Sequence, residues 1–466
     1  MLRTIAFIVA MLTGFGAALF SRYAALLFYL WFAIFRPQEW VWVDIEQYRF
    51  SLLVGLLLII PAVLTGVIPN VTHPLTLGMI AFLSTALVGT LNAVDPPTAW
   101  FHLELLARIV IVSLLLVTLV NTRERFVQTM AVIAGSLGLH ASKFGVSFIM
   151  WGGVRFDSGI GGSFGDNNNF ALAIARILFL LLATSQNIRS VWVKLGFLAA
   201  VPLSCLGLMS TYSRGGFLAA AAGGVVYLLL QRRRVLSMTV IAAAAVVVLW
   251  FVPLPSAYLG RLATIQTYEQ VEDGSAMGRI HFWRIALIMA EDNPLGIGLR
   301  NYERAYDRYD DSLGEHGTGR SVHNTYLQAL VETGYAGAFV WTALLLYSLR
   351  TCFRVRRLAK HQALDADTQR FFFTTSNALI ASMAAFLVGG TFLSELVGDL
   401  NWFIFGLVAA FDLIGKRAIS PAVQPVLANA TGQPAPPVPS RAGVAAALRS
   451  RTPADASTLG RSIPHK

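Results

Sequence analysis

The chain has 466 residues, of which 56% are hydrophobic and only 13% are charged, and its mean hydropathy is +0.62. Soluble domains are usually about 45–50% apolar and about 25% charged, so this composition excludes an ordinary water-soluble globule. The net charge of +11 does not indicate a nucleic-acid partner, because the basic residues lie between long apolar runs, which is typical of membrane topology.

Apolar runs long enough to be helices follow one another along most of the chain. A membrane span needs about 20 residues, with a lower limit near 17, so the first two runs are marginal. We predict an all-α, polytopic membrane protein with about 12 spans, within a range of roughly 11 to 13. The runs cover 4–20, 23–35, 50–68, 74–93, 104–120, 126–150, 168–184, 190–210, 215–230, 236–252, 324–350, 371–394 and 399–415.

Basic clusters predict the orientation of these spans. The arginines at 232–234, the basic residues at 350–360 and the basic tail are placed in the cytoplasm by the positive-inside rule. The segment 253–323 then lies outside, and it carries seven Arg, ten Asp or Glu and no Lys. Thirteen spans would place Met1 outside and twelve would place it inside; we favour twelve.

The orientation divides the chain into four regions. Residues 1–252 are predicted N-terminal transmembrane helices, 253–323 a periplasmic loop domain, 324–417 C-terminal transmembrane helices and 418–466 a disordered cytoplasmic tail rich in Pro, Ala, Ser and Arg. Within the outer loop the pattern predicts helices over 276–291 and 301–311. They are separated by a break at Asn293-Pro294 and by Gly296 and Gly298.

Charged residues within or at the ends of membrane spans cost free energy, so a charged residue found there indicates a structural or functional role. Arg214 lies between the runs 190–210 and 215–230, next to two glycines. Ser213 can cap the helix that begins there, a helix N-terminus favours an anion, and the arginine adds a fork of donors that matches phosphate. The alternative is an interfacial arginine that reaches lipid headgroups.

The outer segment supplies two further candidates. Arg279 and Trp283 share one face of the predicted helix, so Arg279 can meet a lipid phosphate; alternatively it only decorates an interfacial helix. His323 precedes the run 324–350, where a neutral imidazole can accept a proton from a hydroxyl, and Asn324 can hold a sugar hydroxyl. A helix-start histidine with a satisfied hydrogen bond is the alternative.

A glycine- and asparagine-rich stretch runs from Arg155 to Asn169, with Arg155 and Asn168 as possible substrate-binding residues. It is consistent with a loop that approaches sugar or phosphate, and equally with a flexible turn. No metal-binding or nucleotide-binding motif stands in a convincing context, and the acidic residues between Asp307 and Glu315 have no calcium-loop spacing. We therefore expect neither a metal nor another cofactor.

The order of these motifs resembles the O-antigen ligase and polymerase superfamily. The resemblance covers roughly residues 5–415, and the segment from Phe35 to Trp40 is similar to the ligase branch associated with exosortase systems. The ordered motifs are the stretch from Arg155, Ser213-Arg214-Gly215-Gly216, Gly278-Arg279 with Trp283, the segment Asn293–Tyr302 and the segment His323–Gly334.

The resemblance implies an inverting, metal-independent transfer at the periplasmic face of the bacterial inner membrane. A glycan would pass from undecaprenyl diphosphate to a hydroxyl of the lipid A core, with membrane lipids around the protein. Arg214 and Arg279 match the diphosphate-contacting arginines, and His323 matches the proposed base. The stretch Asp166-Asn167-Asn168 departs from the usual Asn-Pro-Asn. Alternatives are an O-antigen polymerase, a protein O-oligosaccharyltransferase and a transporter of the lipid-linked glycan.

Overall fold

The structure is a computed structural model that describes residues 2–41, 50–235, 237–239, 274–361 and 363–419. Nearly all of the predicted span 236–252, the first part of the outer segment and almost the whole tail from 418 lie outside the described residues. The residues that are described form helices and no β-strand, which confirms the predicted all-α class.

Helices coincide with every predicted apolar run inside the described part of the chain. The N-terminal ones are α1 (Leu2–Phe20), α2 (Arg22–Phe35), the 3-10 helix η1 (Pro37–Trp40), α3 (Phe50–Leu64), α4 (Pro74–Leu91), α5 (Pro96–Leu119) and α6 (Arg123–Met150). The short η3 (Gly162–Phe164) precedes α7 (Asn167–Asn187), α8 (Val191–Ser210) and α9 (Arg214–Leu230). The remaining helices are α12 (Gly274–Asp292), α13 (Tyr302–Tyr309), α14 (Thr325–Leu358), α15 (Ala366–Gly389) and α16 (Asp399–Ala418).

Eight of the described helices are long and apolar enough to cross a membrane, and α2, α3 and α9 are shorter apolar helices. These eight candidate spans support the multi-pass architecture, whereas the count of about 12 spans and the periplasmic side of the outer loop stay predictions. The predicted outer-loop helices over 276–291 and 301–311 are α12 and α13.

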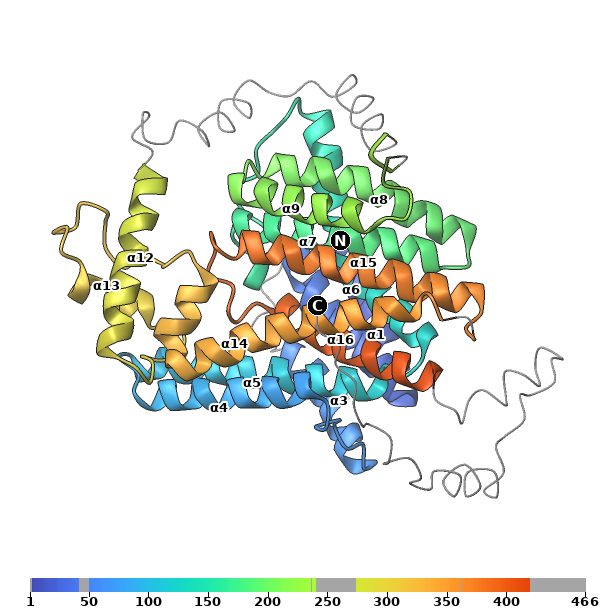
Figure 1. The fold of residues 1–466 in the computed structure, drawn as a ribbon, viewed down its shortest axis with the longest axis horizontal. Helices are drawn as coiled ribbons and strands as arrows, with labels where there is room; N and C mark the ends of the chain where they lie inside the picture. The colour runs from blue at the N-terminus through green and yellow to red at the C-terminus, as the bar shows by residue number, and fades with distance from the viewer. Residues whose placement is uncertain (1, 42–49, 236, 240–273, 362, 420–466) are drawn as a thin grey trace, which may run out of the picture. The chain divides into compact units, whose positions relative to one another are not determined.

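The long helices up to Lys416 form one compact unit and run side by side, with α12 and α13 standing at one end of them, on the left in Figure 1. We call this the outer end; α7, α9 and α14 all begin there. Helix α6 packs on α8, α15 packs on both α7 and α9, and α4 packs on α14. Helix α16 is central, because nearly all its residues from Leu400 to Asp412 are buried.

The direction of the first helices differs from our preferred topology. Ser21 joins α1 and α2 into a hairpin, and Ser21 Oγ caps α2. Helix α2 ends at η1, and α1 contacts η1, with Phe7 of α1 against Phe50 at the start of α3. Helix α1 therefore begins at the outer end, which favours the odd number of spans over the even one.

Three helices differ from the predicted runs because their ends are polar. Helix α5 begins at Pro96 instead of 104, since proline is well suited to the first helical position. Helix α14 continues to Leu358 because the arginines after 350 are good helix formers. Helix α15 begins at Ala366, where the Asp365 side chain accepts a hydrogen bond from the Thr368 N–H (2.9 Å).

A buried carboxylate ties three helices together at the opposite end of the bundle. Asp412 of α16 is 2% exposed, and its oxygens contact His73 Nε2 (3.2 Å), Arg354 of α14 (2.8 Å) and Lys416 Nζ (2.9 Å). A charge so deeply buried is tolerated only with such partners. The cluster is structural and lies far along α14 from His323.

A kink in α14 is completed by the loop after α12. Gly334 has φ +71° and ψ −177°, which interrupts the helix and frees the carbonyl groups before it. The N–H of Ile297 donates to the Val331 oxygen (3.0 Å) and the N–H of Gly298 to the Glu332 oxygen (3.1 Å). The predicted break after α12 is thus the segment that holds the first turns of α14 in place.

Replacing Gly334 by alanine should destabilise the fold. A Cβ there would lie 2.4 Å from the Pro294 carbonyl oxygen, and the backbone angles are accessible almost only to glycine. We expect Gly334→Ala to cost about 2 kcal/mol or more, seen as a lower Tm in detergent. The control is Gly224→Ala in α9, where an added Cβ meets nothing within 4 Å; an equal loss of Tm in both variants would contradict the role of the kink.

Candidate functional site

Polar side chains fasten the beginning of α9 to the beginning of α7. The Ser213 hydroxyl accepts a hydrogen bond from the Gly216 N–H (3.1 Å) and donates one to Asn168 Oδ1 (2.8 Å). Ser213 is the N-cap of α9, as predicted, and Arg214 is the first residue of that helix and is half-buried. The arginine therefore lies at a helix N-terminus, at the outer end.

The asparagine-rich stretch is the first turn of α7 and not an extended loop. The Asp166 carboxylate accepts hydrogen bonds from the N–H groups of Asn168 (2.8 Å) and Asn169 (3.2 Å). Nδ2 of Asn167 donates to the Thr211 carbonyl oxygen (3.1 Å). Asp166 is a favourable N-cap here because its charge also complements the helix dipole.

Arg155 forms a local ion pair in the stretch that precedes this turn. Its Nε lies 2.8 Å from Asp157 Oδ1, and both side chains are largely exposed. The neighbouring Phe156 N–H donates to the Ser210 carbonyl oxygen at the end of α8 (2.9 Å). The role of Arg155 in substrate binding stays a prediction.

Helix α12 packs directly on the residues that precede α14. Nε1 of Trp283 donates to the Val322 carbonyl oxygen (3.1 Å), and the ring centroids of Phe282 and His323 are 6.4 Å apart. Arg279 lies one turn earlier on the same helix and is half-buried. The helix segment that carries Arg279 therefore packs beside His323, although the two residues are more than forty positions apart in the sequence.

His323 is held in a left-handed backbone conformation, with φ +47°, which is uncommon for a residue with a side chain. Asn324 follows it as the N-cap of α14, with Oδ1 accepting from the N–H groups of Tyr326 (3.0 Å) and Leu327 (3.1 Å). The Thr325 N–H donates to the Gly390 oxygen (2.8 Å). The residues that follow His323 are therefore held in place by hydrogen bonds, and the Asn324 side-chain oxygen is occupied by its two capping bonds.

The charges around His323 come from several elements. Burial lowers the pKa of the imidazole below its usual value, and the positive charges of Arg279 and Arg320 lower it further, against the opposing effects of Asp166 and Glu303. Arg279 and Asp166 thus belong to one electrostatic environment with His323. A neutral imidazole is the form that can accept a proton.

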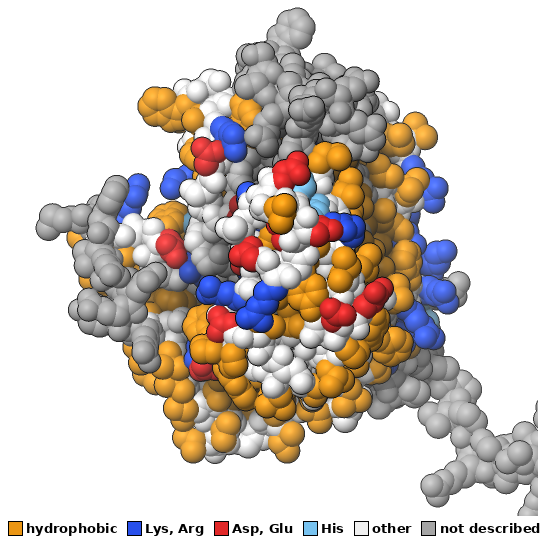
Figure 2. Space-filling model, turned by 90° about the vertical axis from the view of Figure 1, so that its left-hand side faces the viewer, with side chains coloured by type: hydrophobic (Ala, Val, Ile, Leu, Met, Phe, Trp, Pro, Cys, Tyr) orange, Lys and Arg blue, Asp and Glu red, His pale blue; other side chains and the backbone are white. Residues whose placement is uncertain are grey.

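The loop between α15 and α16 links His323 to the start of α9. The hydroxyl groups of Ser321 and Ser394 are hydrogen-bonded (2.9 Å), and a Cβ at Gly215 would lie 3.4 Å from the Phe392 side chain. The segments that carry Arg214, Arg279 and His323 therefore meet at the outer end. Figure 2 shows this end, where basic, acidic and histidine side chains gather among hydrophobic ones.

Sequence reasoning missed a second polar group at the same end. A cavity of about 290 Å³ is lined by Arg36, Asn169, Arg300, Glu395 and Asp399, among others. These residues come from separate parts of the chain, and none of them stands in a pattern that indicates a binding site. Only the fold brings them together.

One group of described residues has the spacing of a metal site. Ligand atoms of His281, Asp310 and Asp311 lie within 4.8 Å of one another. Asp310 accepts a hydrogen bond from His281 Nε2 (2.8 Å), and Asp311 pairs with Arg284. The acidic residues of this segment are therefore partly engaged in an ion-pair cluster between α12 and the end of α13.

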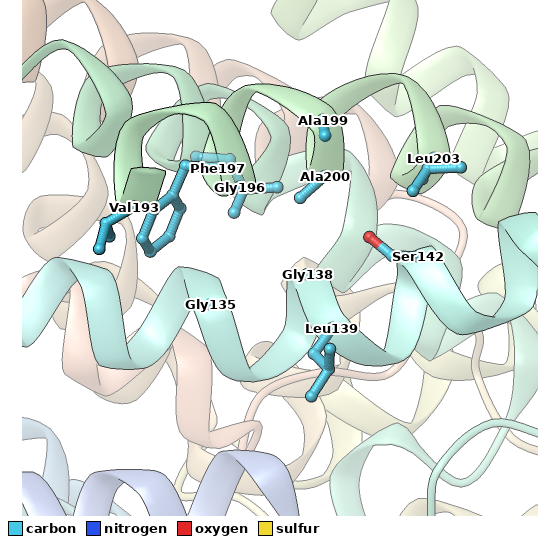
Figure 3. A pocket seen from close by; sticks show the side chains of 11 residues that line it. Gly135, Gly138, Leu139, Ser142, Val193, Gly196, Phe197, Ala199, Ala200 and Leu203 are labelled. Atoms are coloured by element: carbon cyan, nitrogen blue, oxygen red, sulfur yellow. The ribbon is translucent and has the colours of Figure 1, made fainter. Parts of the chain in front are cut away.

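An apolar pocket of about 430 Å³ lies between α6 and α8, away from these groups. Figure 3 shows Phe197 extending from α8 toward α6 and Ser142 extending from α6 toward α8. Its lining contains no ionisable side chain. The pocket can take an apolar group, but it offers no acid, base or phosphate-binding charge.

Comparison with known proteins identifies one family. The model of the family described as O-antigen ligase matches residues 198–342, a range that contains Arg214, Arg279 and His323. The match supports membership of the O-antigen ligase superfamily. No curated protein matches the chain.

Family match and fold together support a general class of protein. An O-antigen ligase family match in a chain with eight candidate membrane spans indicates a multi-pass bacterial membrane protein of the ligase or polymerase type. The donor, the acceptor and the roles of single residues belong to the proposal that follows.

Proposed function

We propose that this protein is an O-antigen ligase that transfers a glycan from undecaprenyl diphosphate to a hydroxyl of the lipid A core, at the periplasmic face of the inner membrane. The observation that carries the proposal is the packing of α12 on the segment before α14, which places Arg279 in the electrostatic environment of a half-buried His323. Together with Arg214, these residues match the superfamily motifs.

The chemistry of the transfer suits these side chains. His323 accepts the proton of the acceptor hydroxyl while that oxygen attacks the anomeric carbon of the donor sugar, with inversion. The bond from the anomeric carbon to the diphosphate oxygen breaks, and the lipid diphosphate leaves as an anion. Arg214 and Arg279 bind that anion, as fixed donors do where charge develops. This scheme needs no metal ion.

The Asn168 carboxamide and Ser213 hydroxyl have a supporting role in this scheme. Because they bind each other (2.8 Å), they set the position of the first turn of α9 and hence of Arg214. Asn324, as the cap of α14, does the same for His323. Arg155 is a further substrate contact in this proposal, to be tested by substitution.

One assay separates this function from the alternatives. The purified protein in nanodiscs receives the lipid-diphosphate glycan and lipid A core, with EDTA present. Transfer to the core is expected. Chain lengthening without core would identify a polymerase, transfer to a protein would identify an oligosaccharyltransferase, and translocation without transfer would contradict the proposal. A requirement for added divalent cation would contradict the metal-free scheme.

The pH profile of transfer should reflect the lowered pKa of His323. The base form is the neutral imidazole, which exists above the pKa, so activity should fall only as the pH drops below the usual histidine range. We expect the acid limb of kcat/KM, which reports the free enzyme, to have its midpoint below about 6.5.

Arg320→Gln provides the matching test of this profile. Arg320 is exposed, and its positive charge is one cause of the lowered pKa, so its removal should move the midpoint to higher pH while kcat at high pH stays unchanged. A midpoint that does not move, or that moves to lower pH, would contradict the assignment of the acid limb to His323.

A further inference from the structure

None of the three predicted residues Arg214, Arg279 and His323 lines the cavity beside Arg300. We call it the outer polar cavity; it is about 290 Å³ in volume and lies between the outer ends of α2, α5 and α7 and the loop before α16. A second hollow of about 480 Å³ shares His102 and Arg300 with it. Together they reach the size usual for small-molecule sites, about 300–1,000 Å³.

The lining of the outer polar cavity offers both signs of charge. Arg36 is paired with Glu39 (3.0 Å) and Arg300 with Glu303 (3.3 Å). Glu395 and Asp399 make no ion pair within the described residues. Asp399 accepts a hydrogen bond from the Ser163 hydroxyl (3.4 Å). The side-chain amide of Asn169 also lines the cavity.

This mixture of groups excludes some ligands by its chemistry. A phosphate group would need an excess of positive charge, but Arg36 and Arg300 are already paired with Glu39 and Glu303. A metal ion would be opposed by the two guanidinium groups. Burial raises the pKa of Glu395 to about 8, against the effects of Arg300 and Arg176, so at neutral pH this side chain can donate a hydrogen bond as well as accept one.

We propose that the outer polar cavity binds a sugar ring of one of the two transfer substrates. Sugar hydroxyl groups both donate and accept hydrogen bonds, which fits a lining of guanidinium, amide, hydroxyl and carboxyl groups at short range. The inference rests on the proposed glycosyl transfer. Ser394 lines the cavity and is bonded to Ser321, two residues before His323, so a sugar bound there lies next to the reacting groups.

The test uses two variants on different helices, Asn169→Leu and His102→Leu, because each removes polar lining without touching Arg214, Arg279 or His323. Asn92→Leu is the matched control: Asn92 is an exposed amide at the outer end of α4 and does not line the cavity. All variants must keep the Tm of the wild type in detergent. We expect roughly a tenfold higher KM for one substrate in both cavity variants, with kcat at saturation retained.

The outcomes of the experiment identify which substrate supplies the sugar. They also distinguish a failure of the cavity assignment from a failure of the proposed ligase function. A raised KM for the acceptor alone assigns the cavity to the lipid A core, and a raised KM for the donor alone assigns it to the transferred glycan. Saturation-transfer NMR with each saccharide freed of its lipid should show binding to the wild type and to Asn92→Leu but not to the cavity variants. Unchanged KM values, or equal NMR binding in all variants, would overturn the cavity assignment. Saccharide binding without any transfer would overturn only the proposed ligase function.

Discussion

His323→Ala should reduce glycan transfer by about 10²–10⁴-fold, the usual contribution of a positioned base, and should leave donor binding nearly unchanged. The imidazole is half-buried with a lowered pKa, so it is neutral when the acceptor hydroxyl must lose its proton. The measurement is single-turnover transfer together with retention of labelled lipid-diphosphate glycan on the purified protein.

A second substitution separates catalysis from backbone strain. His323 has φ +47°, where alanine is strained but asparagine is tolerated, so His323→Asn should fold well and still lose transfer. Added imidazole should restore part of the rate in His323→Ala. His361→Ala, an exposed histidine in the loop between α14 and α15, is the control. Near-wild-type transfer by His323→Asn would show that His323 is not the general base.

Arg214→Lys and Arg279→Lys should each lower kcat/KM for the donor by about 10–100-fold, although the charge is kept. Lysine lacks the planar fork that binds two phosphate oxygens at once, and hydrogen bonds to charged groups are worth about 1.5–3 kcal/mol. The measurement is the initial rate against donor concentration at saturating acceptor.

The arginine on the exposed side of α12 serves as the control. Arg284 pairs with Asp311 at the surface, and surface ion pairs contribute little, so Arg284→Lys should leave donor kinetics unchanged. If Arg284→Lys lowers kcat/KM for the donor as much as the other two variants do, the losses are not specific to diphosphate binding.

The positions of the helices along the chain could be predicted to a large extent from the sequence, because apolar runs and helix caps act locally. The outer-loop helices, the break at Asn293-Pro294 and the cap at Ser213 follow from residues close together in the chain. The kink at Gly334 could not be predicted in the same way. The carbonyl groups before it are satisfied by Ile297 and Gly298, and such pairing exists only after the chain has folded.

The candidate site could be predicted less completely than the fold. The order of the motifs indicates Arg214, Arg279 and His323, but it does not indicate how they are held. The hydrogen bond from Trp283 to Val322 and that between Ser321 and Ser394 join segments that are far apart in sequence. The outer polar cavity could not be predicted, because the residues that line it share no common spacing.

The most direct test is a structure of the protein with the lipid-diphosphate donor bound and a core saccharide supplying the acceptor hydroxyl. We expect the diphosphate to contact the guanidinium groups of both Arg214 and Arg279, with the first sugar turned toward the imidazole of His323. A diphosphate that contacts neither arginine, or that binds at the end of the bundle where Asp412 lies, would contradict the proposed mechanism.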